Sequence, residues 1–367
     1  MTVCAWVRGR AVYLRRMRSE VAALGEAAGG GAGRRFGGRD WLVAVMLLLA
    51  TIQCVRADFL VNETFLDWRE YAVGRAPLPY QGRAGMAPIL RWAGDSARMR
   101  RLAERYAVTV TIGTQHTERI TVEKFTSMLL GLVSLGAMMA AAYWWSRRRE
   151  LEPWWLGNVL VLVMVTAMCV MRATTNYWYP YDLPHAAMFG VGALFALEGM
   201  WAPMLACFAL DVPTRETSLF LVMVAGAMVW VRTGTCRVGK TLAMVGGMGV
   251  YWAAVRWAIA RRYAGNLDLT YPRMRQNVHE MVFPHHWPQL FTAGGYLLVF
   301  VWLERRRLSM EQRALLYACF ACFPITLWFG VWTESRVWLE WTLPMAALGA
   351  VEGVGWMRGY RVAEEAR

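Results

Sequence analysis

Apolar stretches that end at charged residues recur along most of this chain. They lie at 41–56, 125–145, 154–171, 183–197, 201–210, 218–231, 242–258, 289–303, 314–331 and 337–356. A helix crosses a bilayer with about 20 apolar residues, and the shorter stretches approach that length if they extend into polar flanks or lie tilted. The pattern predicts an all-α, polytopic integral membrane bundle of about ten transmembrane helices.

The arginines and lysines in short loops set the expected orientation, because such loops stay on the cytoplasmic side during insertion. The segment before the first stretch is rich in arginine (Arg8, Arg10, Arg15, Arg16, Arg18, Arg34, Arg35 and Arg39), which places the N-terminus inside. Counting spans alternately also places four later basic clusters inside: 147–149, Arg232 with Arg237 and Lys240, 305–307, and Arg358 with Arg361.

This membrane topology divides the chain into three predicted parts. Residues 1–40 form a basic cytoplasmic arm, residues 41–356 form the transmembrane domain with an outer loop at 57–124, and residues 357–367 form a cytoplasmic tail. Both termini are expected in the cytoplasm, and the expected location is a bacterial inner membrane.

Composition favours the membrane class. The chain has 367 residues, of which 57% are hydrophobic and 20 are tryptophan. Its formal net charge of +14 would suit a nucleic-acid partner. However, the arginines concentrate at span ends and in the arm, where they hold topology and meet anionic lipid. We therefore expect a lipid bilayer as partner and no nucleic acid.

Two motifs match known functional patterns, but their surroundings in the sequence do not support those functions. Residues 234–241 match the phosphate-binding loop pattern G-x-x-x-x-G-K-[ST], but they join two apolar spans instead of following a strand in a soluble βαβ unit. We interpret them as a basic cytoplasmic turn. Cys319 and Cys322 form a C-x-x-C inside an apolar stretch with no second pair nearby, which favours a packing role.

The first outer loop interleaves acids with aromatic residues. Asp58 follows the first span, and Asp67, Glu70 and Tyr71 lie further along. Asp67 and Tyr71 are four residues apart, so on a helix they share a face. Such a helix would lie in the membrane interface, and residues 86–106 form a second amphipathic stretch.

Further polar groups fall on the same outer side. Near hydrocarbon such groups are costly unless a cavity, partner or ligand receives them. The further polar groups predicted on the outer side are Arg83, Tyr181, Asp182, His185, Arg215, Glu216, Glu334 and Arg336. The Arg215–Glu216 and Glu334–Arg336 pairs could be simple interfacial ion pairs, and the aromatic run at 177–181 could be an interfacial anchor. Convergence from several loops instead favours one shared binding site. His285 and His286 lack the spacing of a metal motif, so no metal ligand is predicted and the cofactor stays unknown.

Here the chain resembles a family. An acidic residue after the first span, horizontal helices in the first outer loop and about ten spans resemble the GT-C superfamily of integral-membrane glycosyltransferases. The segment 215–217 and the series Glu334, Arg336, Glu340 and Pro344 are similar to motifs in related multi-pass proteins. The resemblance covers residues 41–356.

The resemblance implies transfer of a sugar from a polyprenyl-phosphate donor to a glycan or lipid acceptor on the extracytoplasmic face. It implies a catalytic carboxylate that serves as base or orients the acceptor, at Asp58 or Asp67, with Glu70 as a third candidate. The chain lacks an Asp-x-Asp pair, so a divalent metal is neither required nor excluded by the resemblance.

The residue types fit this chemistry independently. A carboxylate can take the proton of an acceptor hydroxyl, and cations can stabilise a leaving phosphate. Arg83, Arg215 and Arg336 can supply planar, bidentate contacts to phosphate. Three alternatives stay open: an O-antigen type polysaccharide polymerase or ligase, a membrane transporter or flippase, and a subunit that only serves assembly.

Overall fold

The computed structural model describes residues 37–61, 66–106, 110–112, 116–118, 120–170, 179–233, 238–270, 272–284, 287, 297–330 and 335–365. The chain divides into two units, residues 1–46 and 47–367. Of the first unit, the structure describes the start of one helix. The site described below lies entirely within the second unit.

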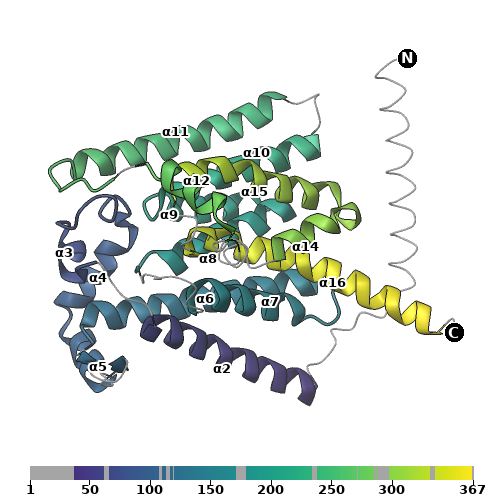
Figure 1. The fold of residues 1–367 in the computed structure, drawn as a ribbon, viewed down its shortest axis with the longest axis horizontal. Coiled ribbons are helices and arrows are strands. Elements are labelled where there is room, and N and C mark those ends of the chain that lie inside the picture. Colours follow the sequence, from purple (N-terminus) through teal and green to yellow (C-terminus); the bar gives the residue numbers. More distant parts are fainter. Residues whose placement is uncertain are drawn as a thin grey trace. The chain divides into compact units, whose positions relative to one another are not determined.

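The described residues are almost entirely helical (Figure 1), which confirms the all-α expectation. The α-helices are α2 (Gly38–Val61), α3 (Trp68–Val73), α4 (Ala87–Asp95), α5 (Ala97–Tyr106), α6 (Val122–Arg148), α7 (Leu156–Val165), α8 (Asp182–Glu198), α9 (Trp201–Asp211), α10 (Leu219–Thr233), α11 (Val238–Arg262), α12 (Met274–Val282), α14 (Leu297–Leu303), α15 (Met310–Phe329) and α16 (Thr342–Glu365). Short 3₁₀ segments are η1 (Ala84–Met86), η3 (Glu216–Ser218), η6 (Arg305–Arg307) and η7 (Ser335–Trp341), and a π turn, η2 (Thr166–Val170), extends α7. One small antiparallel ribbon, β1 (Val110–Ile112) with β2 (His116–Glu118), was not predicted.

Among the described residues, four segments are long and apolar enough to cross a membrane: Gly38–Phe59, Val122–Arg148, Glu216–Thr233 and Val238–Arg262. Each of the ten predicted apolar stretches overlaps a described helix, although residues 289–296 lie outside the described part. The other helices, in the parts of the chain that the structure describes, do not meet the same criteria of length and composition. The membrane class is therefore supported, whereas the count of ten spans is not confirmed.

The predicted first outer loop contains helices, as expected, at Trp68–Val73, Ala87–Asp95 and Ala97–Tyr106. Asp67 begins α3 because its carboxylate accepts hydrogen bonds from the backbone N–H groups of Arg69 and Glu70. Gly74 ends this helix with φ of 89°, a left-handed conformation that glycine adopts without steric strain. The predicted amphipathic stretch 86–106 is two helices, α4 and α5, separated at Ser96.

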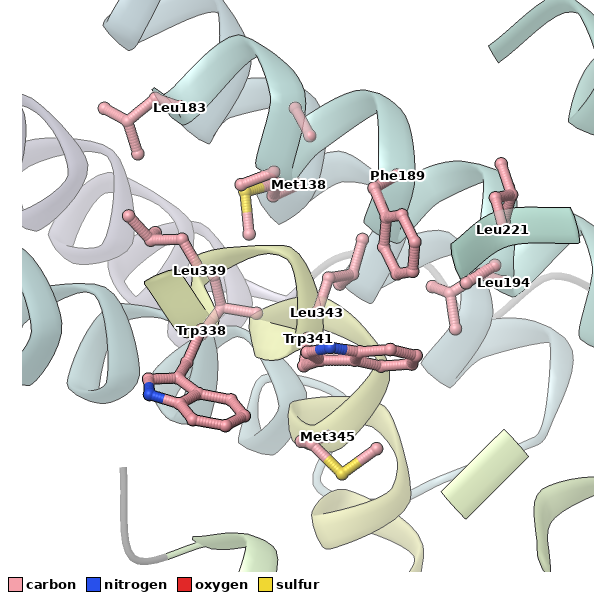
Figure 2. Close-up of a cluster of buried hydrophobic side chains, with 14 of the residues drawn as sticks. Met138, Leu183, Phe189, Leu194, Leu221, Trp338, Leu339, Trp341, Leu343 and Met345 are labelled. Carbon is pink, nitrogen blue, oxygen red and sulfur yellow. The ribbon is translucent and has the colours of Figure 1, made fainter. Parts of the chain in front are cut away.

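Helix α8 lies at the centre of the second unit and packs against α6, α9, α10 and α16. Small residues allow this close approach, because a Cβ added at Gly190 would lie 2.8 Å from Leu343 Cβ. Figure 2 shows the apolar side chains that α8 and η7 share. The Phe189 and Trp341 rings meet edge to face at 5.0 Å. This packing holds η7, and with it Glu340, against α8.

The C-terminal ends of α6, α8 and α10 meet at one end of the bundle. Arg148 and Arg149, at the end of α6, both pair with Glu198, the last residue of α8. Arg232, near the end of α10, donates to the carbonyl of Leu197. Two of the four basic clusters predicted to lie inside therefore meet at this end, which we call the basic end.

The tail and arm predictions stay partly untested. Helix α16 continues through Glu365, so the predicted boundary at 356 falls inside a helix. Of the arm, residues 1–36 lie outside the described part, as do residues 234–237 of the phosphate-loop-like segment. Lys240 and Thr241 of that segment lie in the first turns of α11.

Candidate functional site

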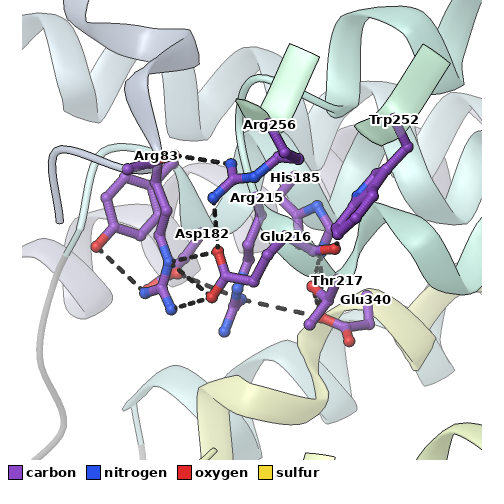
Figure 3. Close-up of polar contacts among 11 residues, drawn as sticks. Arg83, Asp182, His185, Arg215, Glu216, Thr217, Trp252, Arg256 and Glu340 are labelled. Atoms are coloured by element: carbon purple, nitrogen blue, oxygen red, sulfur yellow. Dashed lines mark hydrogen bonds and ion pairs between the residues drawn. The ribbon is translucent and has the colours of Figure 1, made fainter. Parts of the chain in front are cut away.

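Polar side chains from several elements meet at the end of α8 opposite the basic end (Figure 3). We call this group the polar cluster. Its members are Arg83, Tyr181, Asp182, His185, Asp211, Arg215, Glu216, Thr217, Arg256 and Glu340. The cluster lies where α8 and η3 begin and where α9 ends, so one end of the bundle collects its polar groups.

The buried half of the cluster is organised around His185. Its Nδ1 lies 2.7 Å from Asp211 Oδ1 and its Nε2 lies 3.1 Å from Glu340 Oε2, and all three side chains are 0% exposed. A neutral imidazole has one N–H and could donate to only one of these carboxylates. With both carboxylates ionised, these contacts require an imidazolium that donates to both.

The partners of His185 come from far along the chain. Thr217 Oγ1 lies 3.0 Å from His185 Nε2 and 3.4 Å from Glu340 Oε2. Burial raises the pKa of Asp211 above its usual value, and the neighbouring imidazole only partly opposes this effect. The buried carboxylate thus depends on the cation beside it.

Arg215 connects the two halves of the cluster. Its backbone is extended, with φ of −154° and ψ of 146°, so the side chains of Arg215 and Glu216 point in opposite directions. Arg215 Nη1 lies 3.4 Å from Asp182 Oδ1 and 3.9 Å from Glu340 Oε2. Its Nε is buried and has no hydrogen-bond acceptor among the described residues. This guanidinium is buried but incompletely paired.

The open half of the cluster consists of two arginines around one carboxylate. Arg83 Nε lies 3.2 Å from Glu216 Oε1 and 3.1 Å from Oε2, and its Nη2 also contacts Oε1. Arg256 Nη2 lies 3.9 Å from Glu216 Oε2. Burial disfavours the charged form of Arg83, but Glu216 outweighs this effect, so the pKa of Arg83 stands well above its usual value.

A tight backbone contact positions Arg83. The N–H of Gly85 donates to the carbonyl of Pro213 at 2.9 Å, and a Cβ at Gly85 would lie 2.9 Å from the Cα of Thr214. Only glycine allows the loop of Arg83 to approach the turn after α9 this closely. The Tyr71 hydroxyl also donates to the carbonyl of Arg83. Burial raises the pKa of Tyr71, so the hydroxyl stays protonated as a donor.

Three tyrosines stack beside Arg83. The Tyr80 and Tyr179 rings lie 5.3 Å apart, and the Tyr179 and Tyr181 rings lie 5.4 Å apart at 7°. The Arg83 guanidinium lies 5.3 Å from the centre of the Tyr181 ring. Tyr179 and Tyr181 are buried, so these two rings serve packing, whereas Tyr80 is half-buried.

The structure brings together most of the predicted binding residues. Within the polar cluster lie Arg83, Tyr181, Asp182, His185, Arg215 and Glu216. Glu334 lies outside the described residues. Arg336 lies in η7, but its side chain is outside the described part.

The predicted catalytic carboxylates lie in three different settings. Asp67 caps α3, which by itself accounts for an acid at this position. Glu70 forms a surface pair with Arg75 at 3.3 Å. Asp58 is buried near the C-terminal end of α2. Nothing in the structure tests a catalytic role for any of them.

The predicted site residues did not include four members of the cluster: Asp211, Thr217, Arg256 and Glu340. Arg256 had a usable signal, because a single arginine inside an apolar stretch needs a polar partner. Thr217 and Glu340 belonged to the segments that carry the resemblance, but nothing in the sequence pairs Glu340 with His185, which lies 155 residues away.

No group of three or more His, Cys, Asp or Glu side chains that could hold a metal ion is present among the residues described here. Cys319 and Cys322 are free and buried in α15. Comparison with known proteins finds no matching family model, no matching curated protein and no matching solved structure.

Proposed function

We propose that this protein is an integral-membrane glycosyltransferase, resembling the GT-C superfamily, that transfers a sugar from a polyprenyl-phosphate donor to a glycan or lipid acceptor on the extracytoplasmic face. The proposed location is a bacterial inner membrane with both termini in the cytoplasm. Four apolar helices support the membrane part of this proposal.

One observation carries the proposal: three guanidinium groups meet at one end of the bundle, and one of them is buried without a full set of acceptors. Arg83, Arg215 and Arg256 each contact a carboxylate of the cluster. The unpaired Nε of Arg215 favours a further anionic ligand, because an unsatisfied buried donor is costly. A phosphate group on a membrane lipid has the charge and geometry that such arginines bind.

The chemistry follows from the charges. As the bond between sugar and phosphate breaks, negative charge grows on the leaving phosphate, and the guanidiniums stabilise it. A carboxylate accepts the proton of the attacking hydroxyl. Asp58 is the proposed base, because it is the acidic residue that follows the first apolar stretch, where the resemblance implies such a group.

The test is sugar transfer by the purified protein in liposomes, measured with a radiolabelled polyprenyl-phosphate sugar. Arg215→Lys keeps the charge but removes the planar fork, and we expect a fall in transfer of at least about tenfold. Arg232→Lys at the basic end is the matched control and should transfer normally. Full transfer by both Arg215→Lys and Asp58→Asn would contradict the proposal.

One observation favours a second function, a proton-coupled transporter. His185 lies between two buried carboxylates, and such groups also mark proton paths in membrane proteins. The same liposomes separate the two functions. A transporter would move protons across the membrane with its substrate and form no glycosidic bond.

A further inference from the structure

The geometry points to a phosphate subsite formed by Arg83 and Arg256, and we propose that the carboxylate of Glu216 is its displaceable internal occupant. This inference rests on the proposed function for the identity of the ligand, which is the phosphate group of a lipid carrier. It goes further in assigning the arginines that bind this group and the side chain that must leave first.

The first argument is geometric. Arg83 contacts both oxygens of Glu216 through Nε and also uses Nη2, so its planar fork faces the carboxylate. A guanidinium fork binds carboxylate and phosphate through the same pair of parallel N–H groups. Glu216 therefore occupies the position in which a phosphate would bind Arg83.

The second argument is charge. The open half contains Arg83 and Arg256 against Glu216 alone, which leaves a net charge of +1. The buried half, with an imidazolium at His185, contains two cations against Asp182, Asp211 and Glu340. The excess positive charge thus lies in the open half, which favours an anion of higher charge than a carboxylate. The polyprenyl phosphate that is released when the sugar is transferred is a phosphate monoester, which carries between one and two negative charges at neutral pH.

The third argument is exposure. The Glu216 side chain is 36% exposed, whereas those of Arg83 and Arg256 are 14% and 19% exposed. A carboxylate that leaves this position is hydrated at little cost, while the arginines behind it stay largely shielded from water. The exchange of the Glu216 carboxylate for a phosphate, the larger anion, is therefore favoured.

The backbone of Glu216 need not move in this exchange. Trp252 Nε1 donates to the carbonyl of Glu216 at 3.2 Å, which fixes the main chain from α11. Arg256 also donates from Nη1 to the carbonyl of Gly82 at 2.7 Å, which holds its guanidinium in place. Rotation of the Glu216 side chain between staggered rotamers is sufficient to open the subsite.

Glu198 provides a matched control at the other end of the bundle. Its carboxylate likewise contacts two arginines, Arg148 and Arg149, but only 6% of its side chain is exposed. Trp145 Nε1 also donates to it. Arg148 and Arg149 are themselves 51% and 41% exposed, so an anion can reach them without displacing Glu198, and this carboxylate is not a displaceable occupant.

The experiment measures binding to the full-length purified protein in detergent micelles by isothermal titration calorimetry. The probes are farnesyl phosphate, farnesol as the tail alone and inorganic phosphate as the headgroup alone. The variants are Glu216→Gln, Glu198→Gln and the double variant Glu216→Gln with Arg83→Gln.

We expect Glu216→Gln to lower the Kd for farnesyl phosphate about tenfold, because an occupant present over roughly 90% of the time no longer competes. Glu198→Gln should bind as the wild type does, farnesol binding should not change, and the double variant should lose the gain. A gain restricted to farnesyl phosphate identifies a lipid headgroup as the ligand. An equal gain with inorganic phosphate identifies free phosphate as sufficient.

Unchanged or weaker binding by folded Glu216→Gln would overturn the inference, as would an equal gain in Glu198→Gln. If Glu216→Gln does not fold, Glu216→Asp takes its place, since the shorter side chain keeps the charge but withdraws it from Arg83. It should show a smaller gain, and no gain would again overturn the inference. A binding gain without any sugar transfer would refute the proposed function and leave the subsite standing.

Discussion

At the residue scale, His185 decides the stability of the polar cluster. Its ring separates two fully buried carboxylates, which would repel each other and lose hydration without compensation if the cation were absent. No residue near position 185 in the sequence indicates that His185 lies between two buried carboxylates. The sequence supported His185 as a binding residue, and the structure shows that its hydrogen-bond partners are Asp211, Glu340 and Thr217.

His185→Gln should therefore destabilise the protein by about 3–5 kcal/mol, since it leaves two buried carboxylates unpaired. His185→Gln combined with Glu340→Gln should recover part of this loss, because one unpaired charge is removed. The measurement is unfolding in mixed micelles with increasing SDS. His279→Gln, at an exposed position, is the control and should change stability by less than about 0.5 kcal/mol. Equal stability of His185→Gln and the control would refute the imidazolium assignment.

At the element scale, close approach between segments positions the arginines. The loop of Arg83 contacts the turn after α9 only because Gly85 has no side chain. The sequence predicted both segments as outer loops, but glycine is common in loops for many reasons. The need for this glycine follows from the position of Thr214, which lies 129 residues further along the chain, and not from the residues beside it.

Gly85→Ala should destabilise the protein by about 1–3 kcal/mol, because the new Cβ would overlap the backbone of Thr214. It should also weaken farnesyl phosphate binding, since Arg83 is displaced. Both effects are measurable by unfolding and calorimetry as above. Gly246→Ala in α11, where no atom lies within 4 Å of the new Cβ, should be neutral or more stable by up to about 1 kcal/mol. A neutral Gly85→Ala variant would show that the two segments can separate.

At the scale of the whole molecule, polar groups divide between two ends of the bundle. The polar cluster lies at the start of α8, and the basic end lies at its last residue, Glu198. This division agrees with the predicted membrane topology, which placed Asp182, Arg215 and Arg83 outside and residues 147–149 inside. The side of the membrane that each end faces stays a prediction.

Cysteine labelling of intact membrane vesicles tests this division. In a background without the seven native cysteines, Arg69→Cys on α3 and Arg147→Cys at the end of α6 both place an exposed thiol. We expect an impermeant maleimide to label position 69 only from the extracytoplasmic side and position 147 only from the cytoplasmic side. Labelling of both positions from the same side would refute both the predicted membrane topology and the single outer site.

The sequence by itself determined the class of this protein and the position of its apolar helices, because hydropathy and the arginines at span ends act locally along the chain. It also indicated that Arg83, Asp182, His185 and Glu216 belong to one site. Only the tertiary structure decided how they pair. Arg83 meets Glu216 across 133 residues and His185 meets Glu340 across 155, and such contacts arise from the packing of α8, η3 and η7. The tertiary structure likewise assigned Asp67 to a helix cap, because a carboxylate has no fixed role until its hydrogen-bond partners are known.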